Sequence, residues 1–314
     1  MLSTPVEFVD DVAGDNAAQR VAALKPGHFL LLQNLRYDPG EQARDGEFAR
    51  RLARLGDFYV NDAFGTAHRA DVSVAMVPGL IPGYAGRLLM AEIAALSLLR
   101  EGPERPYWVV IGGSKVSDKV GLLGALMGRV DGIVIGGGMA NTFLQAQGVA
   151  MGASKVEAES LSVAIDILRM ARDHDTALVL PDQVVAARGF AADAPARVAA
   201  PGELGAEEMA LDVAESSIDA MLDRMKEART VFWNGPMGVF EWERFRQGTM
   251  RMAQGLARLS AKVVVGGGDS VAAIDLAGVA DRLFHVSTGG GAALEFLQGK
   301  VLPGVDALKH SPRG

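Results

Sequence analysis

Cysteine is absent from the 314 residues of this sequence. Without thiols the protein has no disulfide, no thiol nucleophile and no zinc–thiolate site, which fits a reducing cytosol. The opening segment, MLSTPVEFVDDVAGDN, contains neither a basic stretch nor an uninterrupted apolar stretch, so it is not a signal peptide. No apolar run reaches the roughly 18–20 residues that a membrane helix requires. We therefore expect a cytoplasmic protein that has no membrane partner.

An excess of positive charge is also absent, because 31 lysines and arginines face 38 acidic residues and the formal net charge is −7. A protein that binds nucleic acid needs a basic face to contact phosphates, and no block of like charges provides one locally. We therefore expect no nucleic-acid partner. The length is comfortable for two domains. Hydrophobic residues make up 49 % of the chain and charged residues 22 %, so both domains can fill a core.

Glycine is abundant, and its placement is informative. Of 38 glycines, several form runs directly after short apolar stretches, at 111–113, 135–139, 265–270 and 287–293. Glycine lets the backbone turn sharply and approach a ligand closely, because it has no Cβ. A single run of this kind is most simply a tight strand-to-helix turn. Four runs in one protein favour a ligand site built from these turns.

Short apolar segments alternate with helical patterns along the chain. Residues 28–35 and 57–62 read as strands, and residues 45–56 and 85–102 as helices. Six strand-then-turn units follow, at 107–113, 131–138, 176–182, 230–236, 262–269 and 283–290. Strands that are apolar throughout, with helices between them, predict a parallel sheet covered on both faces.

We therefore expect an α/β fold of two doubly wound, Rossmann-like parallel-sheet domains. A hinge helix over residues 85–102 joins them, and residues 103–300 form a complete second domain. Residues 1–84 hold about three strand–helix units, which are few for a closed doubly wound domain. We therefore expect the N-terminal domain to be incomplete, with the tail at 301–314 returning to it.

Two lysines stand where the chemistry of such a fold is expected. Ligands of open parallel sheets bind at the carboxyl ends of the strands, where helix N-termini favour phosphate. In GGSKVSDK (112–119), Lys115 and Lys119 are four residues apart near an expected helix start at Ser117, so they can share one face. A fixed ammonium there can stabilise charge during phosphoryl transfer. The alternative is a pair of solvated surface lysines.

Other candidates have equally physical alternatives. Asp269 can hold Mg²⁺ through one carboxylate while phosphates and water complete the shell, or it can cap a helix together with Ser270. Glu241 can accept ribose hydroxyls or be an exposed acid. Arg36 and Arg69 can bind anions or form surface ion pairs, which are worth little.

Longer strings carry a resemblance that spacing alone does not. LLLQNLRY, YVNDAFGTAHRA, GGSKVSDK, IGGGMANTF, WNGPMGVFEWERF, GGGDS and HVSTGGGAALEFLQGKVLPGVDAL closely resemble phosphoglycerate kinases, in the order of that family, from about residue 5 to 308. The resemblance implies reversible phosphoryl transfer from 1,3-bisphosphoglycerate to Mg-ADP, giving 3-phosphoglycerate and ATP. It also implies a monomer with an N-terminal glycerate-binding domain, a C-terminal nucleotide-binding domain and closure about a hinge.

The same resemblance assigns roles to individual residues. Arg36 and Arg69 match ligands of the glycerate phosphate, and Lys115 matches the lysine on the transferring phosphoryl group. The glycine-rich turn near that group corresponds to Gly289–Gly291, with Gly290 and Gly291 in the catalytic role. Asp269 matches the aspartate of the metal–nucleotide complex. The remaining nucleotide contacts that the resemblance implies are Gly113, Lys119, Gly137, Gly138, Asn234, Pro236, Glu241, Gly268 and Ser270.

Departures from the family pattern leave alternatives open. The family opens with an RVDxNVP-like strand, a following arginine and an HLGRP-like motif, none of which occurs here, so we interpret Met1 as an internal methionine of a longer reading frame. Gln183 stands where an aspartate is expected, and Ala210 and Ala214 stand where glycines flank the adenine pocket. Asp71 replaces a histidine. A nucleotide-binding module without transferase activity, or a diverged paralogue kept for a partner, are the competing hypotheses.

Overall fold

The structure is a computed structural model that describes residues 4–312, so Met1 and the last two residues of the expected tail lie outside the described residues. The chain divides into two compact units. Unit 1 holds the residues up to Ile93 and those from Lys300 onward, and unit 2 holds Ala94–Gly299. The helix expected over 85–102 is α4 (Arg87–Glu101), which crosses this division. No helix within residues 4–312 is long and apolar enough to span a membrane.

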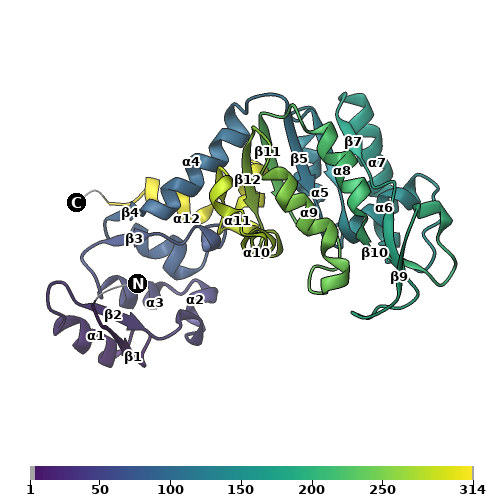
Figure 1. Cartoon of the computed structure of the whole chain (residues 1–314). Coiled ribbons are helices and arrows are strands. Elements are labelled where there is room, and N and C mark those ends of the chain that lie inside the picture. Colours follow the sequence, from purple (N-terminus) through teal and green to yellow (C-terminus); the bar gives the residue numbers. More distant parts are fainter. Residues whose placement is uncertain (1–3, 313–314) are drawn as a thin grey trace. The chain divides into compact units, whose positions relative to one another are not determined.

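Unit 2 is built on a six-stranded parallel sheet in the order β13-β12-β11-β5-β6-β7. Figure 1 labels β12, β11, β5 and β7 of this sheet. The six expected strands are all present, as β5 (Tyr107–Ile111), β6 (Gly132–Ile135), β7 (Ala177–Val179), β11 (Thr230–Asn234), β12 (Lys262–Gly266) and β13 (His285–Val286). The register places Trp233 beside Val265 on one side and Val110 on the other. The central strands β5 and β11 are buried at every position, as expected for a sheet covered on both faces.

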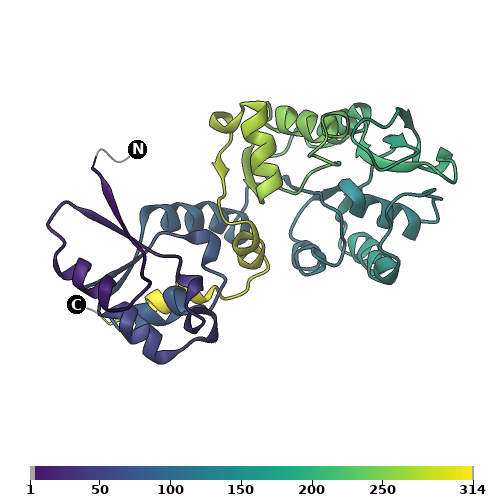
Figure 2. The same cartoon turned by 90° about the horizontal axis from the view of Figure 1, so that it is seen from below.

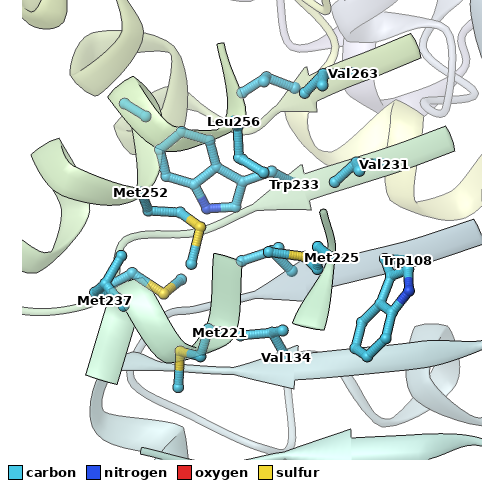
Figure 3. Close-up of a cluster of buried hydrophobic side chains, with 14 of the residues drawn as sticks. Trp108, Val134, Met221, Met225, Val231, Trp233, Met237, Met252, Leu256 and Val263 are labelled. Atoms are coloured by element: carbon cyan, nitrogen blue, oxygen red, sulfur yellow. The ribbon is translucent and has the colours of Figure 1, made fainter. Parts of the chain in front are cut away.

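Two rows of helices supply that cover (Figure 2). One row contains α8 (Glu215–Arg224), α9 (Gln247–Leu256) and α10 (Gly268–Ala277), and the other contains α6 (Gly137–Ala146), α7 (Leu161–Asp173), α5 (Val120–Leu126) and α11 (Gly290–Leu297). Figure 3 shows the core under the first row, where Met252 lies beside Trp233 and Met221 beside Val134, in one cluster with Met225 and Trp108. Residues alternate along a strand, so Tyr107 and Val109 face the second row. The sheet is therefore doubly wound.

A second, antiparallel sheet was not expected from the sequence. It contains β8 (Val184–Ala187), β9 (Ala196–Ala199) and β10 (Met209–Val213) in the order β10-β8-β9. A register shift between Ala210 and Asp212 interrupts the pairing of β10 with β8. These strands are short and rich in alanine, which has low β propensity, so they lack the apolar runs that marked the parallel strands.

Unit 1 contains two parallel strand pairs, β1 (Val6–Val9) with β2 (Phe29–Leu32) and β3 (Tyr59–Asn61) with β4 (Gly83–Ala85). Its helices are α1 (Asp15–Ala22), α2 (Gly40–Ala43), α3 (Gly46–Ala53) and α12 (Pro303–Lys309). The tail packs here, because the Gly304 amide donates to the Ala67 carbonyl at 2.9 Å and the Gly83 amide donates to Ser311 Oγ at 2.6 Å.

One face of the β1–β2 pair is apolar and open. Phe8 and Leu31 are register partners and are 54 % and 58 % exposed, and their neighbours Val6 and Phe29 are exposed on the same face. Among the described residues the two strand pairs of unit 1 do not join into one sheet.

Candidate active site

A cavity of about 360 Å³ lies at the carboxyl ends of β5, β11 and β12. We call it the lysine cavity. Its lining consists of Gly112, Gly113, Ser114, Lys115, Asp118, Lys119, Asn234, Gly235, Pro236, Gly267, Gly268, Asp269, Gly290, Gly291 and Leu294. The helices α10 and α11 begin at this cavity, with Gly268 and Gly290. Their unpaired N–H groups and positive dipole ends make the cavity suited to phosphate.

The backbone that carries the two lysines differs from the expected one. Helix α5 begins at Val120 rather than Ser117, so Lys115 and Lys119 lie in the preceding turn and not four apart on one helical face. Both nevertheless line the lysine cavity. Lys119 donates from Nζ to Asn234 Oδ1. Burial lowers the pKa of Lys119, while the charges of Asp118 and Asp269 act in the opposite direction.

The turn that carries the lysines is held by an acid that the sequence analysis missed. Glu157 accepts hydrogen bonds from the Val116 amide at 2.8 Å and the Ser117 amide at 3.0 Å, and its other oxygen accepts from Ser117 Oγ. The spacing of about forty residues follows no local pattern, so only the folded structure reveals this anchor. By fixing the backbone between Lys115 and Lys119, Glu157 orders both side chains at their bases.

Two glycines are required by the geometry of these turns. A Cβ on Gly112 would lie 2.0 Å from the Pro236 carbonyl oxygen, because the loops after β5 and β11 touch backbone to backbone. Gly267 has φ of +97°, a conformation that L side chains rarely adopt. The glycine runs therefore allow the strand-end loops to pack tightly against one another as well as to approach a ligand.

A larger cavity of about 610 Å³ adjoins the first. We call it the apolar cavity. It shares Gly113, Ser114, Pro236 and Asp269 with the lysine cavity, and its lining also includes the expected residues Gly137, Gly138 and Glu241. The two cavities thus form a continuous cleft. One end is mainly apolar and includes Glu241, and the other contains Lys115, Lys119 and the N-termini of α10 and α11. A nucleoside at the first end would place its phosphates at the second.

The unexpected antiparallel sheet supplies one wall of the apolar cavity. Met209, Ala210 and Leu211 of β10 line it, as does Phe190, whose ring centroid is 4.4 Å from that of Trp242. Ala210, which the sequence analysis expected beside the adenine pocket, therefore lines the apolar cavity. Gln183 and Ala214 are not among the lining residues, and the Ala214 amide donates to the Gln183 carbonyl at 3.1 Å.

Three expected site residues lie outside both cavities. Ser270 is fully buried and accepts a hydrogen bond from the Gly235 amide at 2.6 Å, so it supports the loop after β11. Arg36 and Arg69 belong to unit 1. Arg36 forms an ion pair with Asp71 at 2.8 Å, which is a physical role for the aspartate that replaces the family's histidine.

The donor set suits a magnesium ion that arrives with a nucleotide. Asp269 is in the first turn of α10, lines both cavities and interacts electrostatically with Lys119. The part of the chain that the structure describes has no cluster of three or more acidic or histidine side chains able to hold a metal alone. Mg²⁺ commonly uses one or two carboxylates and completes its shell with phosphates and water, so the residues present fit this ion.

A doubly wound parallel sheet with a glycine-lined cleft that contains lysines at the carboxyl ends of its strands is typical of nucleotide-dependent phosphotransferases. A family profile described as "Phosphoglycerate kinase" matches residues 1–300. The chain belongs to the phosphoglycerate kinase family, a family of phosphotransferases, and this confirms the resemblance and the α/β fold class expected from the sequence.

Individual relatives agree. The chain is 50 % identical over 299 residues to a phosphoglycerate kinase of Roseiflexus sp., covering 95 % of this chain and 75 % of the relative. It is 49 % identical over 308 residues to that of Moorella thermoacetica, covering 98 % and 78 %. Among solved structures, phosphoglycerate kinase from Coxiella burnetii superposes with a TM-score of 0.85 at 41 % identity, covering 97 % of this chain and 77 % of that one.

Proposed function

We propose that this protein catalyses the reversible transfer of a phosphoryl group between 1,3-bisphosphoglycerate and Mg-ADP, the phosphoglycerate kinase step of glycolysis. The observation that carries the proposal is family membership across residues 1–300 together with the continuous cleft of unit 2. In this reaction an oxygen of the ADP β-phosphate attacks the phosphorus of the acyl phosphate. The bond from phosphorus to the acyl oxygen breaks, and 3-phosphoglycerate leaves as the carboxylate.

The nucleotide is assigned to the cleft of unit 2. The adenosine occupies the apolar cavity between the glycines of α6 and the wall formed by β10, with Glu241 accepting from the ribose. The phosphates extend into the lysine cavity, where the N-termini of α10 and α11 and the Lys119 ammonium meet negative charge. Asp269 would hold Mg²⁺ here, and the ion would supply positive charge beside the phosphates.

Lys115 is assigned to the transferring phosphoryl group. It is exposed at the cavity and makes no ion pair within residues 4–312, so its ammonium is available to the ligand. Charge on the equatorial oxygens grows in the transition state, and a group aimed at it accelerates the reaction rather than binding the ground state. The amides of Gly290 and Gly291 at the start of α11 supply neutral donors to the same region.

We assign the glycerate to unit 1 through Arg36 and Arg69. We propose that residues 1–84 form part of its domain together with the tail at 301–314, that the helix at 85–102 is the hinge and that 103–300 bind nucleotide. A monomer acting on small molecules in the cytoplasm is the matching biological setting. Bidentate guanidinium–phosphate recognition supports the choice of arginines for the glycerate phosphate.

Titration calorimetry with Mg-ADP, run beside a coupled assay of 3-phosphoglycerate phosphorylation, tests the proposal. We expect Mg-ADP to bind, and Lys115→Ala to lower kcat by at least about 100-fold and the Mg-ADP affinity by less than about threefold. Lys226→Ala, an exposed lysine remote from both cavities, is the matched control and should change neither.

Other outcomes separate the alternatives. Tight Mg-ADP binding without turnover would identify a nucleotide-binding module, and the absence of both would identify a diverged paralogue. Equal losses of kcat and affinity in Lys115→Ala would contradict its role in the transition state.

A further inference from the structure

A separate cavity of about 380 Å³ lies at the amino ends of the parallel strands, opposite the carboxyl ends where the lysine cavity lies. We call it the arginine cavity. It is lined by Arg100 at the end of α4, Arg105 before β5 and Arg129 before β6, over apolar residues that include Leu126 and Leu297. The strand β5 starts at this cavity and ends at the lysine cavity, roughly 15 Å away along the strand. The size is within the range of small-molecule sites.

The three guanidinium groups are held in place but are only partly used. Arg105 pairs with Asp131 at 2.9 Å and donates to the Arg129 carbonyl at 3.0 Å. Arg129 donates to the Arg100 carbonyl, and the Arg100 guanidinium lies 5.0 Å from the centre of the Phe296 ring. Each guanidinium has five donors. Across residues 4–312, Asp131 is the one acid that forms an ion pair with these three arginines, so the cavity retains positive charge.

Tyr107 provides an independent indication of a ligand. It lines the cavity, is only 1 % exposed, and its hydroxyl has no hydrogen-bond partner anywhere in the described part of unit 2. Buried hydroxyls are rarely left unpaired, because the loss of hydration is not compensated. Burial raises the pKa of Tyr107, and the charge of Arg129 lowers it, so the phenol and this guanidinium lie close enough to interact.

We propose that the arginine cavity binds a small, multiply charged oxyanion, a phosphate ester or a polycarboxylate, through Arg100, Arg129 and the Tyr107 hydroxyl. Planar guanidinium groups recognise both kinds of oxyanion through paired N–H donors. The phenol supplies the hydrogen bond that it lacks in the free protein. The apolar residues at the base of the cavity accommodate the carbon skeleton of such a ligand.

Fluorine NMR of the full chain labelled with 3-fluorotyrosine tests this proposal at the site itself. The sequence has four tyrosines, and the resonance lost in Tyr107→Phe identifies Tyr107. Inorganic phosphate and citrate are titrated separately, with sodium chloride at matched ionic strength. We expect a saturable shift of the Tyr107 resonance with at least one of the two anions and none with chloride. Phosphate alone would indicate a phosphate ester, and citrate alone a polycarboxylate.

Variants show whether the arginines are responsible. Arg129→Gln should weaken the apparent affinity by about tenfold or more, as expected for loss of a charged hydrogen-bonding group. Arg100→Gln is the second variant, because Arg129 also holds a backbone carbonyl and its loss can disturb folding. Arg282→Gln, an exposed arginine before the far edge strand β13, is the matched control and should leave the titration unchanged.

An independent prediction concerns the free protein. In chloride buffer Tyr107→Phe should melt at the same temperature as the parent or higher, because an unpaired buried hydroxyl is removed. It should gain less thermal stability than the parent when the anion is added. A Tyr107 resonance that does not shift, or that shifts equally with chloride, would overturn the proposal. So would a titration that is the same in both arginine variants as in the parent. Lys115→Ala should not alter this titration, so phosphate in the active site is distinguished from phosphate here.

Discussion

Asp212 is expected to make the stability of unit 2 fall as the pH rises toward neutrality. The side chain is buried in β10, and Gly248 and Val213 donate backbone N–H groups to its two oxygens at 2.8 and 2.9 Å. Desolvation by burial raises the pKa of Asp212 to about 8, and these backbone hydrogen bonds only partly oppose it. The ordinary value for the unfolded chain is 3.8. Between these two values the folded protein holds a proton that the unfolded chain releases.

The sign and size of the effect follow from proton linkage. Because the folded state binds more protons, the free energy of unfolding decreases with pH, by at most about 1.4 kcal/mol per pH unit for one group. The decrease begins near pH 4 and ends near pH 8. Between pH 5.5 and 7.5 the contribution from Asp212 amounts to roughly 2–3 kcal/mol. Asp212→Asn removes the titrating proton and should remove this part of the slope.

Denaturant unfolding followed by tryptophan fluorescence measures the stability of unit 2, where Asp212 lies. All three tryptophans of the sequence, Trp108, Trp233 and Trp242, lie in unit 2. At pH 5.5 we expect Asp212→Asn to be less stable than the parent by about 1–2 kcal/mol, because the amide NH₂ cannot accept one of the two backbone N–H bonds that the Asp212 oxygens accept. At pH 7.5 it should equal or exceed the parent.

Asp223→Asn, which removes an exposed carboxylate from the end of α8, is the control and should leave the slope of the parent intact. If the difference between Asp212→Asn and the parent is the same at both pH values, Asp212 is ionised throughout this range and the reasoning is refuted.

Three further predictions concern the cleft and its supports. Lys119→Met should lower Mg-ADP affinity by more than about tenfold in calorimetry. The melting temperature should stay within about 2 °C, because the lost hydrogen bond to Asn234 is offset by removal of a desolvated cation. Gly112→Ala should destabilise unit 2 by about 3 kcal/mol or more in denaturant unfolding, since its Cβ meets a backbone oxygen, whereas Gly124→Ala, in α5 with open space around it, should stabilise by about 0.5–1 kcal/mol. Arg197 lowers the pKa of Glu208 to about 2, so Glu208→Gln should lower the melting temperature at pH 7, with the deficit shrinking as the pH falls from about 4.5 toward 2; a constant deficit would contradict this pairing.

The parallel sheet was predictable because its signal is local. Each of its six strands is an apolar run that ends in a turn, and burial on both faces demands that composition. The site at the carboxyl edge followed from the same reasoning, since the turns gather there once the strands are parallel. Strand ends made Lys115, Lys119 and Asp269 candidates with open alternatives, and the structure brings all three to one cavity.

What could not be predicted depends on residues that are distant in sequence. Glu157 anchors the lysine turn across about forty residues, and Phe190 reaches the apolar cavity through a sheet with weak local signals. The prediction that Lys115 and Lys119 share one helical face was wrong for a related reason. Hydrogen bonds from Val116 and Ser117 to Glu157 hold the turn open, and α5 starts only at Val120. A tertiary contact here overrides the local helical pattern.

Helix termini place opposite backbone partial charges at the carboxyl and amino ends of the parallel strands, and this explains why the sites at the two ends differ. At the carboxyl edge helices begin, so N–H groups and glycine turns can hold phosphate with few side chains. At the amino edge helices end, and their carbonyls attract cations, as when Arg129 donates to the Arg100 carbonyl at the end of α4. An anion can bind at that edge only if guanidinium groups first reverse its polarity. Capping accounts for one donor of Arg129 but not for the unpaired hydroxyl of Tyr107 beside it, and that hydroxyl is the reason to look for a ligand there.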